Sequence, residues 1–86
     1  MKLEFKGTTY DDIQFWALND KRKLIKIFEL IKDIELNKFI GKGKPESLKY
    51  ELSGYWSRRI DDEHRLIYKI IEDTIEIISC KYHYKR

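Results

Sequence analysis

The order of hydrophobic and polar residues divides the chain into a strand, two helices and a further group of strands. Residues 2–6 alternate charged and apolar side chains, which is the period of a half-buried strand with Leu3 and Phe5 turned inward. Acidic residues early in the next segment favour a first helix, which ends near Asp20. From about 21 to 37, apolar residues recur every three or four positions, as in an amphipathic helix. These residues are Leu24, Ile27, Phe28, Ile31 and Ile34.

The second half of the chain changes to strand-like spacing. Residues 38–45 contain two glycines and the only proline, which predicts a loop region that continues into Glu46. Apolar runs follow at 55–60, 65–71 and 74–82, separated by short polar turns, and they predict a three-strand antiparallel meander. The predicted fold is therefore a small, single α+β domain over residues 1–86, with the helices packed on one face of the sheet.

Several single residues receive a structural interpretation from this pattern. Trp16 and Phe28 lie among the apolar positions of the two predicted helices and are expected in the core. Cys80 lies in an apolar strand, so burial is expected and a nucleophilic role is not. His64 follows three acidic residues and is interpreted as part of a polar turn.

Composition limits the classes of function. The chain has 18 Lys and Arg against 15 Asp and Glu, a net charge of +3. This net charge is too small to indicate nucleic-acid binding by itself, so any such evidence must come from the positions of the cations. The single cysteine excludes an internal disulfide and fits a reducing cytosol. We expect a cytoplasmic protein without a membrane span, because no apolar run is long enough for one.

Polar and basic side chains gather in the loop region and where the predicted strands end. They are Lys44, Glu46 and Lys49 in and after the loop, and Arg59, Arg65, Lys81 and His83 at the strand ends. The chain then closes with aromatic residues around His83, including Tyr84. This mixture of a carboxylate, cations, an imidazole and aromatic rings is the candidate functional site.

The candidate residues suit acid–base chemistry on RNA. Two histidines without the spacing of a zinc motif predict no metal site, and no phosphate-binding glycine loop or other cofactor motif is present. RNA can be cut through its own 2′-OH if a base takes the hydroxyl proton, an acid protonates the leaving 5′-oxygen and cations stabilise the phosphorus oxygens. Glu46 is the candidate base and His83 the candidate acid. Arg59, Arg65 and the lysines are the candidate phosphate clamp, and Tyr84 can stack on a base.

Each of these residues also has a plain structural interpretation. His83 can be a surface histidine, and Glu46 can be a solvated ion pair among lysines. Arg65 can simply pair with the acidic residues 61–63. Residue types alone leave these alternatives open.

Four motifs together resemble the YoeB (Txe) toxins, which belong to the RelE/ParE superfamily of bacterial toxin–antitoxin modules. The similarity extends over essentially the whole chain. The motifs are GKGKPE at residues 41–46, LSGYWSRRI at 52–60, EHRLIY at 63–68 and YHY at 82–84.

The resemblance implies an mRNA interferase that cuts messenger RNA in the ribosomal A site, forms a homodimer and is neutralised by a YefM-type antitoxin. It implies catalytic roles for Glu46, Arg65, His83 and Tyr84. It also implies contacts of Lys49 and Arg59 with phosphate or ribosomal RNA. The family pattern commonly stops at the position of Tyr84, whereas Lys85 and Arg86 follow here.

Two other classes of function remain open at the level of the sequence. One is a non-enzymatic toxin of the same fold that acts on a protein target such as gyrase, and the other is a plain RNA-binding module. The combination of Glu46, Arg65, His83 and Tyr84 argues against the toxin with a protein target, because a protein that only binds does not require it.

Overall fold

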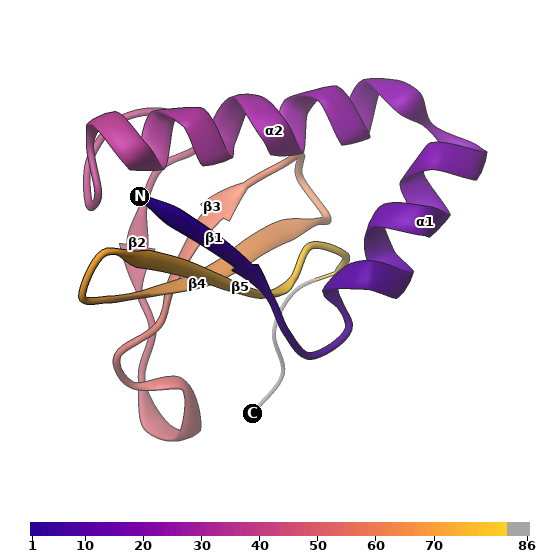
Figure 1. The fold of residues 1–86 in the computed structure, drawn as a ribbon. Coiled ribbons are helices and arrows are strands. Elements are labelled where there is room, and N and C mark those ends of the chain that lie inside the picture. The colour runs from indigo at the N-terminus through magenta and orange to yellow at the C-terminus, as the bar shows by residue number, and fades with distance from the viewer. Residues whose placement is uncertain (83–86) are drawn as a thin grey trace.

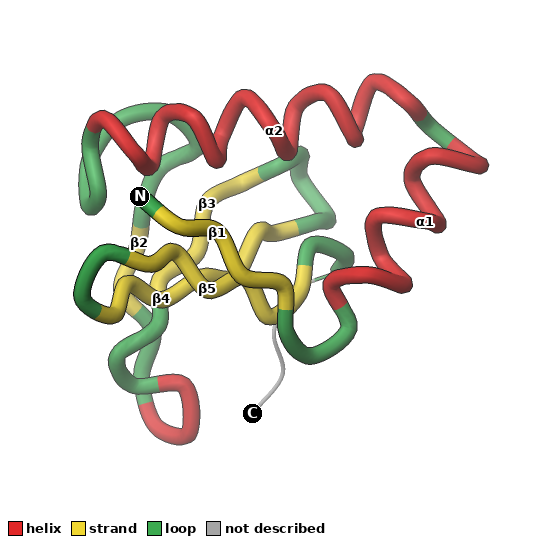
Figure 2. The backbone as a smooth tube through the Cα atoms, in the orientation of Figure 1, coloured by secondary structure: helices red, strands yellow, loops and turns green. Residues whose placement is uncertain are grey.

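The computed structural model describes residues 1–82, which form a mixed sheet with both helices packed against one of its faces (Figures 1 and 2). The predicted α+β fold is confirmed, as is the order of strand, helix, helix and three strands, and one short strand is added. The elements are β1 (Lys2–Phe5), α1 (Thr9–Asn19), α2 (Lys21–Leu36), β2 (Glu46–Ser47), a 3-10 turn (Tyr50–Leu52), β3 (Trp56–Arg59), β4 (Arg65–Ile71) and β5 (Thr74–Ser79).

The sheet has five strands in the order β1-β5-β4-β3-β2. β1 runs parallel to β5, and the other neighbours are antiparallel. Phe5 packs against the core as predicted, but Leu3 stays 42% exposed because β1 is an edge strand. The loop region predicted after residue 37 ends earlier than expected, because Glu46 and Ser47 pair with β3 as the two-residue strand β2.

The last strand is shorter than predicted. Ile67 pairs with Ser79 and the next residue, Tyr68, pairs with Ile77, so the ladder shifts at Ile78 and pairing stops after Ser79. Such a bulge reverses the alternation of side chains beyond it. Cys80 therefore joins Ile75 and Ile77 in the core, whereas strict alternation would have placed it on the opposite face.

The core forms between the helices and the near face of the sheet. The inner stripe of α2 consists of Ile27, Leu30, Ile31 and Ile34, and α1 contributes Trp16 as predicted. Phe28 was expected in the core, but it is 40% exposed. The buried stripe is centred nearer Leu30, which turns Phe28 toward the outer side of the helix. Within residues 1–82, no helix is both long and apolar enough to cross a membrane.

A single polar residue separates the two helices. Asp20 has an extended backbone, and its side chain accepts a hydrogen bond from the backbone N–H of Arg22 at 3.1 Å. This is the arrangement of a helix N-cap, so α2 begins directly after α1 ends.

A buried arginine holds the loop after α2 against the sheet. Arg58 is fully buried, and its guanidinium forms an ion pair with Asp33. Its remaining N–H groups donate to four oxygens, the carbonyls of Asn37, Ile40 and Lys42 and the hydroxyl of Tyr68. All five donors of the guanidinium are therefore used, as a buried charge requires.

The loop continues close to this arginine. Gly43 has a φ of 80°, and a Cβ atom there would lie 3.1 Å from the Cβ of Arg58. Its carbonyl accepts a hydrogen bond from the backbone N–H of Arg59 at 2.7 Å. The contacts of Arg58 and Gly43 thus deliver the chain to β2 in register with β3.

Arg58 and Arg59 provide a matched test of this interpretation. Arg58→Met should lower the free energy of unfolding by about 3–5 kcal/mol, because Asp33 and three carbonyls lose their buried partner. Arg59→Met, at an exposed position, should change it by less than about 0.5 kcal/mol. Urea unfolding of both variants measures the difference, and equal effects would contradict the role assigned to Arg58.

Candidate functional site

Three of the predicted site residues, Glu46, Arg59 and Arg65, lie on the face of the sheet turned away from the helices. Leu66 and Tyr68 of β4 belong to the core cluster, so Arg65 and Ile67 point to the opposite face. The strand register then places Glu46, Ser57, Ile67 and Ser79 in one row across this helix-free face, because directly paired residues share a face. Glu46 thereby gains a fixed position on a strand.

The two predicted clamp arginines are directly opposite each other on the same face. Arg59 of β3 pairs with Arg65 of β4. Arg59 is also the diagonal neighbour of Glu46. Diagonal neighbours in a sheet lie roughly 7–8 Å apart, which long side chains can bridge. Like charges in directly paired positions destabilise a sheet. Within residues 1–82, neither arginine forms an ion pair with a carboxylate, so the pair presents uncompensated positive charge beside Glu46.

Arg65 is held by backbone oxygens. Its Nη1 donates to the carbonyl of Asp61 at 2.8 Å and to that of His64 at 3.1 Å. The alternative in which Arg65 pairs with acidic side chains of residues 61–63 is therefore wrong. The contacts fix one side of the guanidinium without neutralising its charge.

The helix-free face has a buried floor. Ile67 is fully buried, and Ser57 is 4% exposed, although no helix covers them. Leu48, which follows β2, is also buried, at 6% exposure. Glu46 and Arg59 are themselves exposed and Arg65 is half-buried, so these charged side chains border the buried floor while remaining accessible to solvent.

The predicted binding lysines lie in different places. Lys44 and Lys49 flank β2 on its two sides, and both are exposed. The ammonium of Lys81 instead lies 3.7 Å from the ring centre of Phe15 in α1 and 5.0 Å from that of Tyr82. Among residues 1–82, Lys81 thus contacts these aromatic rings and neither Glu46 nor the arginine pair.

The last two predicted catalytic residues, His83 and Tyr84, lie outside the described residues. The described chain ends at Tyr82, whose carbonyl accepts a hydrogen bond from the backbone N–H of Arg65 at 3.1 Å. The point from which the sequence continues to His83 is therefore beside Arg65.

Two further polar residues, Cys80 and His64, are buried. Cys80 is completely buried as predicted; burial raises the pKa of its thiol to about 12, and the nearby carboxylate of Asp12 adds to the shift. His64 is also buried, at 9% exposure, which its interpretation as a polar turn residue did not anticipate. The acidic residues that precede His64 give no signal of burial, which comes from contacts with residues distant in the chain: its ring packs against Trp16, and its Nδ1 accepts a hydrogen bond from the backbone N–H of Tyr82 at 2.7 Å.

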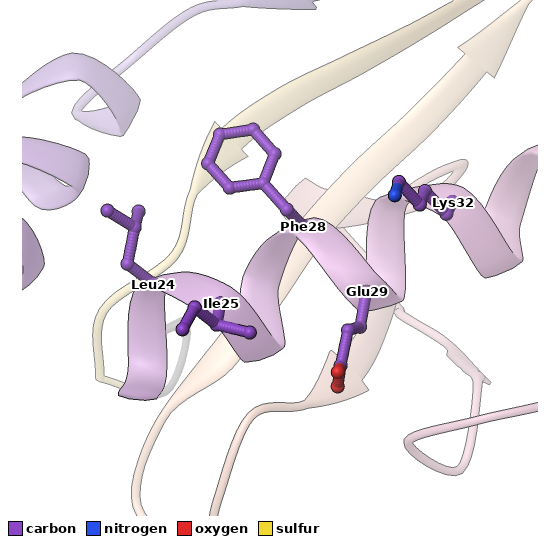
Figure 3. A pocket seen from close by; sticks show the side chains of 5 residues that line it. All are labelled: Leu24, Ile25, Phe28, Glu29 and Lys32. Atoms are coloured by element: carbon purple, nitrogen blue, oxygen red, sulfur yellow. The ribbon is translucent and has the colours of Figure 1, made fainter. Parts of the chain in front are cut away.

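A separate hollow lies on the outer side of α2 (Figure 3). It has a volume of about 370 Å³, and Figure 3 shows its lining side chains projecting from that one helix, namely Leu24, Ile25, Phe28, Glu29 and Lys32. None of the predicted site residues contributes to it. Within residues 1–82, no cluster of three or more His, Cys, Asp or Glu side chains is arranged to hold a metal ion.

Known proteins share this sequence and this arrangement. The sequence profile of the YoeB-like toxins of bacterial type II toxin–antitoxin systems matches residues 5–84. Toxin YoeB of Escherichia coli (strain K12) is 52% identical over 84 residues, which are 98% of this chain and 100% of that protein.

Solved structures agree with the sequence comparison. The YoeB/ParE toxin from Agrobacterium tumefaciens superimposes with a TM-score of 0.94 at 43% identity, covering 98% of this chain and 100% of that one. The YoeB dimer from Staphylococcus aureus gives 0.91 at 46% identity and 98% coverage of both chains, and the YoeB–YefM complex from the same organism gives 0.89 at 46% identity, again with 98% coverage of both.

These similarities define first a class and then a family. The helix-covered sheet is the fold of small toxins of toxin–antitoxin modules. Within that class, the chain belongs to the family of YoeB-like toxins of bacterial type II toxin–antitoxin systems.

The turn that carries His64 and Arg65 depends on one carboxylate. Asp61 accepts hydrogen bonds from Lys23 Nζ at 2.9 Å and from the backbone N–H groups of Glu63 and His64 at 2.8 and 2.6 Å. Partial burial alone would raise the pKa of Asp61, but Lys23 and the two N–H groups outweigh it and lower the pKa from 3.8 to about 2. The carboxylate is thus stabilised in the folded protein.

This shift predicts a pH-dependent contribution to stability. A carboxyl group whose folded pKa is lowered stabilises the fold above its unfolded pKa, and the contribution is lost as the pH falls from about 4 to about 2. Asp61→Asn should therefore cost roughly 1–2 kcal/mol near neutral pH, and the cost should shrink as the pH approaches about 2. Urea unfolding from about pH 6 to about pH 2.5 tests this, with the exposed Asp62→Asn as control. A cost for Asp61→Asn that does not change with pH would contradict it.

Proposed function

We propose that this chain is a ribosome-dependent endoribonuclease that cuts messenger RNA in the ribosomal A site and thereby inhibits translation. The observation that supports this most strongly is the placement of Glu46 beside the unneutralised pair of Arg59 and Arg65 on one helix-free face. A carboxylate next to two cations suits a phosphodiester whose own 2′-OH is the nucleophile.

The proposed reaction uses side chains only and needs no cofactor. Glu46 takes the proton of the 2′-OH, the resulting alkoxide attacks the adjacent phosphorus, and the bond from phosphorus to the 5′-oxygen breaks. His83 donates a proton to that leaving oxygen. The products are a 2′,3′-cyclic phosphate and a free 5′-OH.

The arginine pair stabilises the charge that develops during this reaction. Negative charge grows on the phosphorus oxygens as the alkoxide attacks, and preorganised donors aimed at such charge lower the barrier. Arg65 is the better oriented of the two, because two backbone carbonyls already fix its guanidinium. In the proposal Lys44, Lys49, Arg59 and Lys81 bind phosphate groups of messenger or ribosomal RNA, and Tyr84 stacks on a base.

The partners follow from the same site. A basic catalytic face attracts an acidic, disordered antitoxin segment that folds over it, and a YefM-type antitoxin fits this role. The Staphylococcus aureus relative is described both as a dimer and as a heterotetrameric complex with YefM. We extend both assemblies to this chain, and we place it in the cytoplasm, where its ribosomal substrate lies.

Removal of the proposed base or acid should abolish cleavage. Glu46→Ala and His83→Ala should each reduce the cutting of the A-site codon by roughly 10²-fold or more, because each proton transfer contributes about that much. Toeprinting of messenger RNA on programmed ribosomes measures the cuts, with the exposed Lys32→Ala on the far helix as control.

Other results of the same assay would favour the alternatives. Wild-type protein that binds programmed ribosomes without cutting would indicate an RNA-binding module. Intact messenger RNA together with gyrase-dependent DNA damage would indicate a toxin with a protein target. Unchanged cleavage in both variants would remove Glu46 and His83 from the mechanism.

Arg65 should act on the transition state and not on binding. Arg65→Ala should lower the cleavage rate at saturating toxin by about 10²-fold, the typical cost of removing one donor to a developing oxyanion, and leave ribosome affinity nearly unchanged. Lys49→Ala is the comparison variant, and it should weaken ribosome affinity more than it lowers the cleavage rate. Single-turnover cleavage over a range of toxin concentrations separates the two quantities, and equal losses of rate and affinity for Arg65→Ala would refute its assignment.

A further inference from the structure

The backbone directly after β5 is held by side chains of α1. The N–H of Cys80 donates to the carboxylate of Asp12 at 2.9 Å, and the carbonyl of Cys80 accepts from Trp16 Nε1 at 2.8 Å. Both partners belong to α1. The chain is thus tied to this helix directly after the sheet pairing ends.

Tyr82 is tied at both of its backbone polar groups. Its N–H donates to Nδ1 of His64 at 2.7 Å, and its carbonyl accepts from the N–H of Arg65 at 3.1 Å. The residue has a φ of 62°, a left-handed conformation that is costly for a side chain of this size. Such strain persists only where the surroundings fix it, and it concentrates at functional sites.

The imidazole of His64 is itself firmly held. Its ring packs edge-on against Trp16, with 4.7 Å between the ring centres and 87° between the planes. The Asp61 carboxylate accepts its backbone N–H at 2.6 Å, and Nε2 lies 3.5 Å from a carboxylate oxygen of Glu63. Since Nδ1 accepts the Tyr82 hydrogen bond, the hydrogen-bond pattern assigns the proton of the neutral ring to Nε2, toward Glu63.

This geometry gives His64 a role different from acid–base catalysis. The lone pair of Nδ1 is already engaged by the Tyr82 N–H, and the ring is buried. His64 cannot exchange a proton with RNA without releasing Tyr82. Its contacts are directed to the backbone that carries the end of the chain.

We propose that His64 is a positioning residue: its Nδ1 fixes Tyr82 beside Arg65 and so sets the place from which the chain delivers His83 and Tyr84 to the substrate. The inference rests on the proposed endoribonuclease function, because His83 follows Tyr82 directly in the sequence. Arg65 takes part from the neighbouring position, since its backbone holds Tyr82 while its side chain faces the helix-free side of the sheet. A misplacement of about 1 Å in a catalytic group can cost about 10²-fold in rate.

Two substitutions separate positioning from packing. His64→Asn keeps an acceptor at about the place of Nδ1 but removes the ring that packs on Trp16. His64→Phe keeps a ring but removes the acceptor. If His64 positions Tyr82, His64→Phe should lose about 10²-fold in single-turnover cleavage on programmed ribosomes at unchanged ribosome affinity, and His64→Asn should retain activity within about tenfold.

A second measurement does not depend on cleavage. Hydrogen exchange of the Tyr82 amide should be faster in His64→Phe than in wild type and near wild type in His64→Asn, because only the first variant lacks the acceptor. If His64→Phe does not fold, as judged by urea unfolding, His64→Gln replaces it. The glutamine oxygen reaches the place of Nε2 and not that of Nδ1.

The outcomes distinguish this inference from the proposed function. Full cleavage by His64→Phe, or a greater loss in His64→Asn than in His64→Phe, would leave His64 with a packing role only. Unchanged exchange of the Tyr82 amide in His64→Phe would refute the contact itself. Absence of cleavage by the wild-type protein would refute the endoribonuclease proposal, and the exchange measurement would still decide whether His64 holds Tyr82.

Discussion

The buried guanidinium of Arg58 is the interaction on which the rest of the structure depends. It joins α2, through Asp33, to three carbonyls of the following loop, and it does so from the middle of β3. This connection brings the loop to β2 and sets Glu46 opposite Ser57. Because side chains alternate along a strand, burying Arg58 turns Arg59 outward toward Arg65. Adjacent arginines of the same chemistry thus have opposite roles, one in stability and one at the candidate site.

Part of this arrangement could be predicted from the sequence because it depends on the spacing of apolar residues within single helices and strands. Helix and strand spacing indicated the order of elements. The strand β2 left no periodic signal, since two residues cannot show one. The bulge at Ile78, the burial of His64 and the ligands of Arg58 all arise from contacts between residues distant in the chain. Phe28 was misplaced because the apolar stripe of α2 is wider than the part of it that meets the sheet.

The two faces of the sheet have different roles. The helix side supplies stability through a continuous apolar core, while the free side has a small buried floor and carries charge. RNA brings its own nucleophile, so a site of this kind requires only a base, an acid and cations in a fixed arrangement. In the proposed mechanism, β2, β3 and β4 supply the described part of that set, and contacts with α1 and His64 hold the segment that leads to the remainder. The hollow on α2 lies outside this arrangement.

The central claim is that the helix-free face cuts messenger RNA through the RNA's own 2′-OH. The most direct test is a messenger RNA carrying a single 2′-deoxynucleotide on the 5′ side of the bond that is cut in the A site. We expect cleavage at that bond to disappear, and the products from unmodified RNA to carry a 2′,3′-cyclic phosphate and a free 5′-OH. Cleavage of the deoxy substrate at the normal rate, or products with a 5′-phosphate, would contradict the mechanism.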